Sequence, residues 1–322
     1  MKNKVIVKSD DEPDPRYGCY PEKRSIEEYL KKGIINLDKP SGPTSHQVVH
    51  WVKEILKIDK AGHSGTLDPK TTGVLPVALE DSTKIIRVFF PFKKEYVTIM
   101  NLHKNVPEEN LKEVLNYFQG RIIQRPPVKS SVKRQLRVRT VEYIKFLEKD
   151  EKSVLFIVGC ESGTYIRKLC HDIGLILGVG AHMTELRRTK AGPFTEKSAR
   201  TLHDIKDAYE FYIEDENEKY LREYILPIEV GVEHLKKVWA KDSAISAICH
   251  GADLNAPGIS KFNSGIEVTE LVAIMSLKNE LVAIGTSLRT SDEIMEMDRG
   301  KVIDLERVIM KIGTYPKKWK FE

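Results

Sequence analysis

The chain has 322 residues, of which 41% are hydrophobic, so it is long enough for about two domains with buried cores. Lys and Arg number 52 against 47 Asp and Glu, which gives a net charge of only +5. This balance excludes a strongly basic chain, so an argument for nucleic-acid binding must rest on where the basic residues lie. The four cysteines form no CxxC pair, which argues against a disulfide framework and against a zinc site.

The apolar segments are short. The longest runs, SVLFIVG and LVAIM, cannot span a bilayer, and the first residues, MKNKVIVKSDDEPDP, lack the apolar region of a signal peptide. We therefore expect a globular protein that stays in the cytoplasm, has no membrane partner and keeps its thiols reduced.

The first elements follow from caps and apolar spacing. Residues 1–32 mix acids and prolines with one short helix from Ser25, and we expect this extension to pack on another part of the protein. The run 33–40 predicts a strand that ends at a proline. Thr44 or Ser45 can cap the following helix, in which apolar residues recur at helical spacing: Val48, Val52, Ile55 and Leu56.

The segment GHSGTLDP, residues 62–69, places Asp68 among small, turn-forming residues and directly before a proline. A helix interior or a central strand is excluded there, so the segment predicts a rigid loop that holds the carboxylate outward. An isolated Asp-Pro more often closes a turn through its own backbone. The length of the surrounding pattern, which continues as TTGVLP, favours a functional carboxylate over that structural role.

The middle of the chain mixes strands and helices without strict alternation. We expect a strand over 95–102, a helix over 108–120 that Gly120 stops, strands over 138–150 and 153–162, and a helix from Thr164 to Gly178. A charged stretch at 214–219 is interpreted as a surface excursion, and short strands follow a boundary near residue 232. The pattern predicts an α+β fold with a mixed, largely antiparallel sheet and a small β-rich module after it.

Basic residues cluster twice, with apolar or aromatic residues between them. The first run, within 126–139, carries Lys129, Lys133, Arg134, Arg137 and Arg139. The second, within 311–321, carries Lys311, Lys317, Lys318 and Lys320 around the rings of Tyr315 and Trp319. Taken alone, these runs fit a solvated face as well as they fit an RNA-binding surface with stacking rings.

Several long motifs in one order carry a resemblance to a known family. The chain resembles the TruB-type pseudouridine synthases, and more narrowly their archaeal and eukaryotic, dyskerin-like branch, the catalytic subunits of H/ACA ribonucleoproteins. The motifs are GIINLDKPSGPTSH, GHSGTLDPKTTGVLP, KEYV, GTYIRKL and MTELRRTKAGPF. Near the C-terminus, HGADLNAPGI, ELVAI and LVAIGTS look like a PUA domain. The resemblance covers nearly the whole chain.

This resemblance implies a domain plan and a reaction. It implies an N-terminal extension (1–32), a pseudouridine synthase catalytic domain (33–231), a PUA RNA-binding domain (232–311) and a basic tail (312–322). Uridine in RNA would lose its glycosidic bond, and the base would rotate and rejoin the ribose through C5. The family requires no metal and no organic cofactor.

The family's site residues carry over onto matched positions. Asp68 would be the nucleophile, attacking either the ribose carbon or the pyrimidine ring, and Arg167 would keep it charged in a water-poor pocket. Tyr96 would stack on the flipped base and could help to remove the C5 proton. Tyr165 and Leu186 would wall the pocket, with His63 near the vacated stack. Taken singly, Tyr165 and Leu186 fit core residues equally well, and His63 fits a turn histidine.

The RNA-binding candidates are Lys129, Lys133, Arg134, Gly251, Lys317 and Lys318. The chain lacks the longer insertions with which bacterial members grip tRNA, so an archaeal-type, guide-dependent enzyme fits best. Its partners would be guide RNA, rRNA, tRNA and small H/ACA accessory proteins, with the T-loop uridine of tRNA as a second target of the same enzyme. A stand-alone synthase for the T-loop uridine of tRNA remains an alternative. So does a non-catalytic ribosome-assembly scaffold, although the joint presence of Asp68, Tyr96 and Arg167 argues against it.

Overall fold

The computed structural model describes residues 4–126, 133 and 135–317. By their internal contacts these residues form two compact units. One, here called the catalytic unit, comprises residues 35–78 and 85–224. The other, here called the C-terminal unit, comprises the residues up to 34, residues 79–84 and those from 225 onward.

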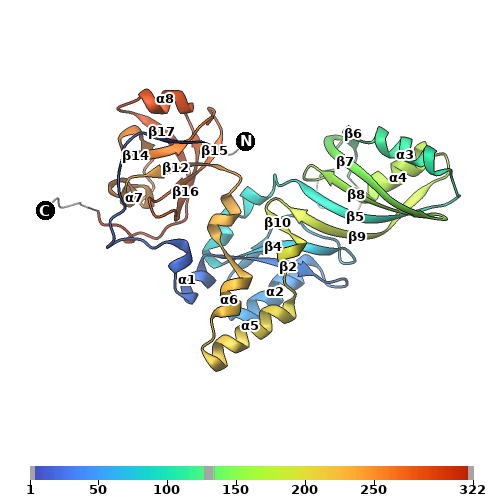
Figure 1. The fold of residues 1–322 in the computed structure, drawn as a ribbon, viewed down its shortest axis with the longest axis horizontal. Coiled ribbons are helices and arrows are strands. Elements are labelled where there is room, and N and C mark those ends of the chain that lie inside the picture. Colours follow the sequence, from blue (N-terminus) through green and yellow to red (C-terminus); the bar gives the residue numbers. More distant parts are fainter. Residues whose placement is uncertain (1–3, 127–132, 134, 318–322) are drawn as a thin grey trace. The chain divides into compact units, whose positions relative to one another are not determined.

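A long mixed sheet forms the catalytic unit, with the strand order β2-β4-β9-β5-β8-β7-β6 (Figure 1). Most of its pairs are antiparallel, and β4 pairs with β9 in parallel. The strands are β2 (Gly33–Lys39), β4 (Thr72–Leu79), β5 (Lys94–Leu102), β6 (Gly120–Gln124), β7 (Arg137–Asp150), β8 (Ser153–Cys160) and β9 (Ala181–Ala191). Two short strands, β3 (Ala61–His63) and β10 (Phe194–Thr195), pair with β4 and β9.

Helices cover this sheet at two places, as Figure 1 shows. α2 and α5 pack on each other near β2 and β4, whereas α3 and α4 pack on the strands β5 to β9. Apolar residues of α3 and α4 share one core with β5, β7 and β8: Leu111, Leu115, Leu169, Ile173, Met100, Phe156 and Val158. The helices are α2 (Ser45–Leu56), α3 (Glu108–Tyr117), α4 (Ile166–Ile176), α5 (Leu202–Asp215) and α6 (Lys219–Tyr224), and the 3-10 segments are η2 (Glu80–Phe89) and η3 (Glu196–Ser198).

Local capping explains where two of these helices begin. Thr44 caps α2 as predicted, because its hydroxyl accepts from the Gln47 backbone while the Gln47 side chain accepts from the Thr44 backbone. Thr201 and Asp204 form the same box at the start of α5. The charged stretch 214–219, interpreted from the sequence as a surface excursion, is largely exposed, and it contains the end of α5 and the start of α6.

Two other helix ends differ from the sequence expectation. Gly120 does not stop α3, which ends at Tyr117; it opens β6 with φ 101°. Thr164 does not cap α4, because Tyr165 is the N-cap residue and the Thr164 hydroxyl instead donates to the Glu161 carbonyl. In both cases the turn residue lies two or three positions from the helix end, a difference that a local pattern does not resolve.

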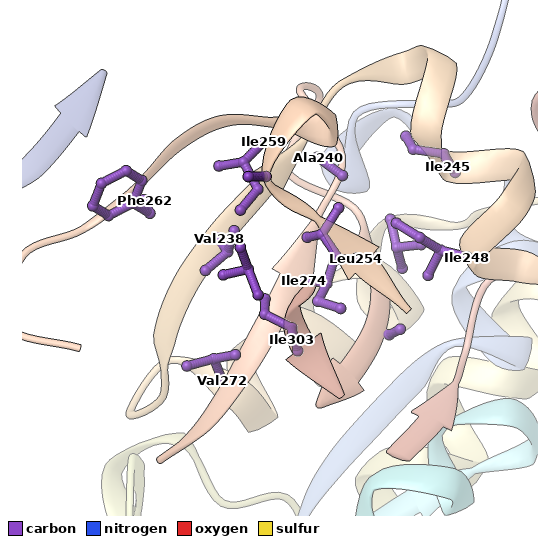
Figure 2. Packing of buried hydrophobic residues seen from close by; sticks show 14 of the residues in the cluster. Val238, Ala240, Ile245, Ile248, Leu254, Ile259, Phe262, Val272, Ile274 and Ile303 are labelled. Atoms are coloured by element: carbon purple, nitrogen blue, oxygen red, sulfur yellow. The ribbon is translucent and has the colours of Figure 1, made fainter. Parts of the chain in front are cut away.

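The C-terminal unit is a small β-rich module. Its sheet has the order β1-β14-β12-β15-β16-β17-β13, and its core is built from aliphatic residues such as Val238, Ile259 and Ile274 (Figure 2). Its strands are β1 (Val5–Val7), β12 (Lys236–Ala240), β13 (Leu254–Asn255), β14 (Ile259–Asn263), β15 (Leu271–Met275), β16 (Leu281–Ser287) and β17 (Lys301–Val308). The short strand β11 (Ile225–Pro227) also falls in this unit but is not part of this sheet. The helices are α1 (Ile26–Lys31), α7 (Asp242–Cys249) and α8 (Ser291–Glu296), with 3-10 segments η1 (Pro21–Lys23), η4 (Ile228–Val232) and η5 (Ala256–Gly258).

The N-terminal extension packs on this module, as expected. β1 pairs with β14, from Val5 opposite Asn263 to Val7 opposite Lys261. The Lys278 ammonium group donates to carbonyl oxygens of the extension, including that of Tyr17 at 2.5 Å. The short helix α1 begins after Ser25, whose hydroxyl accepts from the Glu28 backbone. The extension is thus part of the β-rich unit.

Candidate active site

The loop between β3 and β4 holds Asp68, and a buried hydroxyl group fixes its backbone. Ser45, the first residue of α2, is completely buried. Its Oγ accepts a hydrogen bond from the Leu67 amide at 2.9 Å and donates to the Leu67 carbonyl at 3.0 Å. Both polar groups of the residue before Asp68 are therefore satisfied by one side chain.

A buried ammonium group holds the other side of the same loop. Lys39, at the end of β2, is completely buried, and its Nζ donates to the carbonyls of Pro40, Pro69 and Thr71 at 2.8, 3.0 and 3.0 Å. Burial lowers the pKa of Lys39, and the nearby charge of Asp68 partly opposes this shift. The backbone on both sides of Asp68 is thus anchored, which is the rigidity that a functional carboxylate requires.

The Asp68 side chain forms an ion pair with Arg167. Arg167 is the second residue of α4, and its Nη2 contacts Asp68 Oδ2. The sequence-based expectation placed this pair in a water-poor pocket, but the two side chains remain 58% and 51% exposed. The Asp68 backbone carbonyl meanwhile accepts from the Thr71 amide at 2.9 Å, so the turn closes through the backbone and leaves the carboxylate to Arg167.

Tyr96 lies half-buried on β5 and is the cross-strand partner of Arg188 on β9. Burial raises the pKa of the Tyr96 phenol, the guanidinium group of Arg188 opposes this shift, and the charge of Asp68 adds to it. The charge of Asp68 thus acts on Tyr96, as a shared site requires.

Tyr165 and Leu186 lie on the elements that carry Arg167 and Arg188. The Tyr165 amide donates to Gln124 Oε1 at 2.9 Å, and Gln124 Nε2 donates to the Tyr165 carbonyl at 3.2 Å. Leu186 is partly buried and packs against the apolar core beside α3 and α4. Both residues are partly buried, and of the two Leu186 packs on this core. Gln124, which fixes the start of α4, had no distinguishing signal in the sequence.

His63 precedes the loop, and its ring lies 5.0 Å from the ring of His46 in an edge-on arrangement. The pKa of His63 is lowered to about 4, mainly by burial and to a smaller extent by the neighbouring His46 and Arg188. The ring is therefore neutral at pH 7. Within the described residues, Nδ1 of His63 is buried without a hydrogen-bond partner. A turn histidine with satisfied nitrogens does not match this geometry.

Models of known families match consecutive parts of the chain. They are the DKCLD (NUC011) domain (residues 1–49), the TruB family pseudouridylate synthase N-terminal domain (53–166), the tRNA pseudouridylate synthase B C-terminal domain (167–233) and the PUA domain (236–309). The "probable tRNA pseudouridine synthase B" of Methanopyrus kandleri is 58% identical over 98% of this chain and 93% of its own. That of Pyrococcus furiosus is 55% identical over 99% of this chain and 95% of its own.

The chain belongs to the TruB family of pseudouridine synthases.

Solved structures of this synthase family match the whole fold. One, from a Cbf5-Nop10-Gar1 complex, has a TM-score of 0.94 at 55% identity and covers 99% of this chain and 97% of its own. Another, from an H/ACA RNP bound to a substrate RNA containing 2′-deoxyuridine, has a TM-score of 0.93 at 53% identity and covers 99% and 98%. The expected fold class, a mixed and largely antiparallel catalytic sheet plus a PUA domain, is confirmed.

A cavity of about 570 Å³ opens beside the Asp68 loop of this synthase. Lys70 and Thr72 line it from the loop side, and Val97, Ile99 and Leu186 line it from β5 and β9. Within the described ranges, no three or more His, Cys, Asp or Glu side chains are grouped so that they could hold a metal ion. No helix among these residues is long and apolar enough to cross a membrane.

The RNA-binding candidates are distributed over both units. Lys133 in the catalytic unit and Lys317 in the C-terminal unit are exposed, and Gly251 follows α7 with φ 95° and open space around it. Lys129, Arg134 and Lys318 lie outside the described residues, as do Trp319 and Lys320. Tyr315 was wrongly interpreted as a stacking ring in the basic tail: it is 1% exposed and belongs to the core of the C-terminal unit.

Proposed function

We propose that this pseudouridine synthase uses Asp68 as its nucleophile and acts as the catalytic subunit of a guide-RNA particle. The observation that carries the first part is the loop itself, in which buried side chains anchor the backbone and leave the carboxylate exposed against Arg167. A carboxylate held this way needs no rearrangement before it attacks.

The isomerisation requires the uracil ring to leave ribose C1′, rotate and rejoin through C5, after which the C5 proton is released. The carboxylate of Asp68 attacks either C1′ or the ring, and both routes need it ionised. Arg167 supports the ionised form by direct contact. In the RNA-bound enzyme the flipped base displaces water from this half-open pair and strengthens the interaction.

The remaining pocket residues receive the base. Tyr96 offers an aromatic face and a hydroxyl whose pKa responds to the charge of Asp68, and Leu186 offers an apolar side chain. Tyr165 would close the other side of the pocket. Stacking on an aromatic ring returns about 1 to 3 kcal/mol per base, against a flipping cost of a few kcal/mol. The neutral His63 ring is suited to replacing the flipped base in the stack, because an uncharged ring is cheaper to bury than an imidazolium.

The test of the nucleophile is tritium release from C5-tritiated uridine under single-turnover conditions. Asp68→Asn keeps the shape and removes the charge, so turnover should fall below detection while RNA affinity remains within about twofold. Asp150→Asn, an isosteric change at the turn between β7 and β8, is the matched control and should retain activity. Turnover by Asp68→Asn at the control rate would refute the assignment.

The particle is supported by the full-length match to subunits of the Cbf5-Nop10-Gar1 complex and of the RNA-bound H/ACA RNP. The partners of the present chain would accordingly be guide RNA, rRNA substrate and the small accessory proteins of that particle. The PUA domain, with Gly251 in an open turn, would hold the guide RNA, and the lysines Lys133 and Lys317 would contact phosphates. Lys129, Arg134 and Lys318 belong to the same proposal. The cytoplasmic location expected from the sequence belongs to it as well.

Reconstitution separates this function from its alternatives. Release of tritium from an rRNA fragment only after addition of guide RNA and accessory proteins would support the particle. Equal activity of the purified chain alone on a tRNA transcript would instead favour a stand-alone tRNA synthase, which the names of the Methanopyrus and Pyrococcus relatives make a specific second candidate. Binding of RNA without release under either condition would favour the scaffold.

A further inference from the structure

A buried arginine beside the site has no role in the function proposed above. Arg188 lies in β9, is 1% exposed, and is among the largest fully buried side chains of the described residues. Its guanidinium group donates to backbone carbonyls, from Nε to Val74 at 2.6 Å and from Nη1 to Gly65 at 2.9 Å. Burial lowers the pKa of Arg188, and the opposing contribution comes from the Tyr96 phenol. Burying a cation is costly, so a purely structural site would be served better by an apolar side chain.

The two carbonyls bracket the catalytic loop. Gly65 lies three positions before Asp68, and Val74 lies in β4 just after the loop. One planar group therefore fixes the separation of the loop's two ends. The fit is close: a Cβ on Gly65 would lie 3.3 Å from Arg188 Nη1, and Gly73 leaves room for the Arg188 backbone only because it has no side chain.

Tyr96 lies beside Arg188 on the neighbouring strand β5. The two residues are direct cross-strand partners, so their side chains emerge on the same face of the sheet. Nη2 is buried and has no hydrogen-bond partner among the described residues. The phenol of Tyr96, on the paired residue, opposes the lowering of the pKa of Arg188 that burial causes. Arginine carries donors only. A hydroxyl held by Arg188 must therefore accept with its oxygen and point its own proton elsewhere.

We propose that Arg188 is a positioning residue that sets Tyr96 in register with the Asp68 loop and orients the Tyr96 hydroxyl as a donor into the pocket. The inference rests on the proposed function, in which Tyr96 and Asp68 share the flipped uridine. Arg188 touches neither substrate nor the reacting atoms: it acts through Tyr96 and through the carbonyls of Gly65 and Val74. Lysine cannot replace it, because a single ammonium group lacks the planar fork that reaches three directions.

A double-mutant cycle tests this coupling by single-turnover tritium release. Arg188→Lys keeps the charge and should slow turnover by about tenfold or more, with the affinity for RNA unchanged. In the Tyr96→Phe background the same change should cost less than about threefold, because its target oxygen is already gone. The matched control is Arg187→Lys, which removes the guanidinium group of the preceding residue of β9, where it pairs with Asp38. This change should have the same small effect on turnover in both backgrounds.

A loss from Arg188→Lys that is equal in the two backgrounds, or no loss at all, would overturn the proposal. Full activity of Asp68→Asn would show that the proposed function itself fails, which is a separate result. If the Arg188 variants do not fold, ¹⁵N-arginine NMR on the otherwise intact protein answers the question. Protection of the Arg188 Nη protons that is lost in Tyr96→Phe supports the coupling, and protection unchanged by that substitution overturns it.

Discussion

Removing the hydroxyl of Ser45 should loosen the loop that carries Asp68. In Ser45→Ala the Leu67 amide and carbonyl lose their partner inside a site that is completely buried. Each lost hydrogen bond of this kind costs about 1 kcal/mol, and a buried group left unsatisfied costs about 1 to 3 kcal/mol. With two groups affected and partial relaxation of the loop, the free energy of unfolding should fall by about 2 to 4 kcal/mol.

The assay compares denaturant unfolding of Ser45→Ala with that of Ser41→Ala. Ser41 Oγ donates to the Lys70 carbonyl of the same loop, but at 3.4 Å and in an exposed position. Water replaces such a bond, so this control should lose no more than about 0.5 kcal/mol. Because the chain has two compact units, hydrogen exchange at the Leu67 amide should accompany the bulk measurement. Equal stability of the two variants, with unchanged protection of Leu67, would refute the reasoning.

Three further predictions concern the same region. Gly73→Ala would place a Cβ 2.2 Å from the Arg188 carbonyl oxygen at φ 100°, so the free energy of unfolding should fall by about 3 kcal/mol or more. The control Gly42→Ala, at φ 113°, has nothing within 4 Å of the added Cβ. It should show only the backbone strain, about 1 kcal/mol. Similar melting temperatures for the two would contradict this. Because the fold lowers the pKa of His63 from 6.5 to about 4, the unfolded chain binds a proton first as the pH falls. The free energy of unfolding should therefore fall as the pH is lowered from about 6.5 to about 4. In urea unfolding, a His63→Gln variant should show a shallower fall over this range. Parallel curves of stability against pH for the two proteins would count against a buried neutral ring. Arg167→Ala should slow tritium release by at least about 100-fold while the affinity for RNA changes little, because Arg167 supports the charge of Asp68. A loss confined to RNA affinity would instead show that Arg167 serves to bind the RNA.

The sequence predicted the loop around Asp68 correctly for local reasons. Small residues and a proline around Asp68 exclude helix and strand, and the structure shows an anchored loop at that place. The helix after Thr44 followed from its cap and apolar face, and β5 from its alternation. Helix boundaries at Gly120 and Thr164 were wrong because neighbouring turn residues carry nearly the same local signal.

Side-chain environment was harder to predict. Tyr315 sits among lysines in the sequence, yet it is buried in the core of the C-terminal unit, because packing selects an aromatic ring for its volume whatever its neighbours are. Arg188 and Ser45 lie within motifs that the sequence marked, but no local pattern distinguishes a buried hydrogen-bonding side chain from an exposed one.

What the sequence determined by itself was the family, the mixed and largely antiparallel fold, and the position of Asp68 on a loop, since all of these rest on residue types at short range. What only the tertiary structure decided is how that loop is held and what faces it. Ser45 and Leu67 are 22 positions apart, Asp68 and Arg167 are 99, and Gly65 and Arg188 are 123. The contact between Gly65 and Arg188 depends on the pairing of β9 with β4 and β5, and the other two depend on where α2 and α4 pack. Directional hydrogen bonds form only once these elements have fixed the backbone.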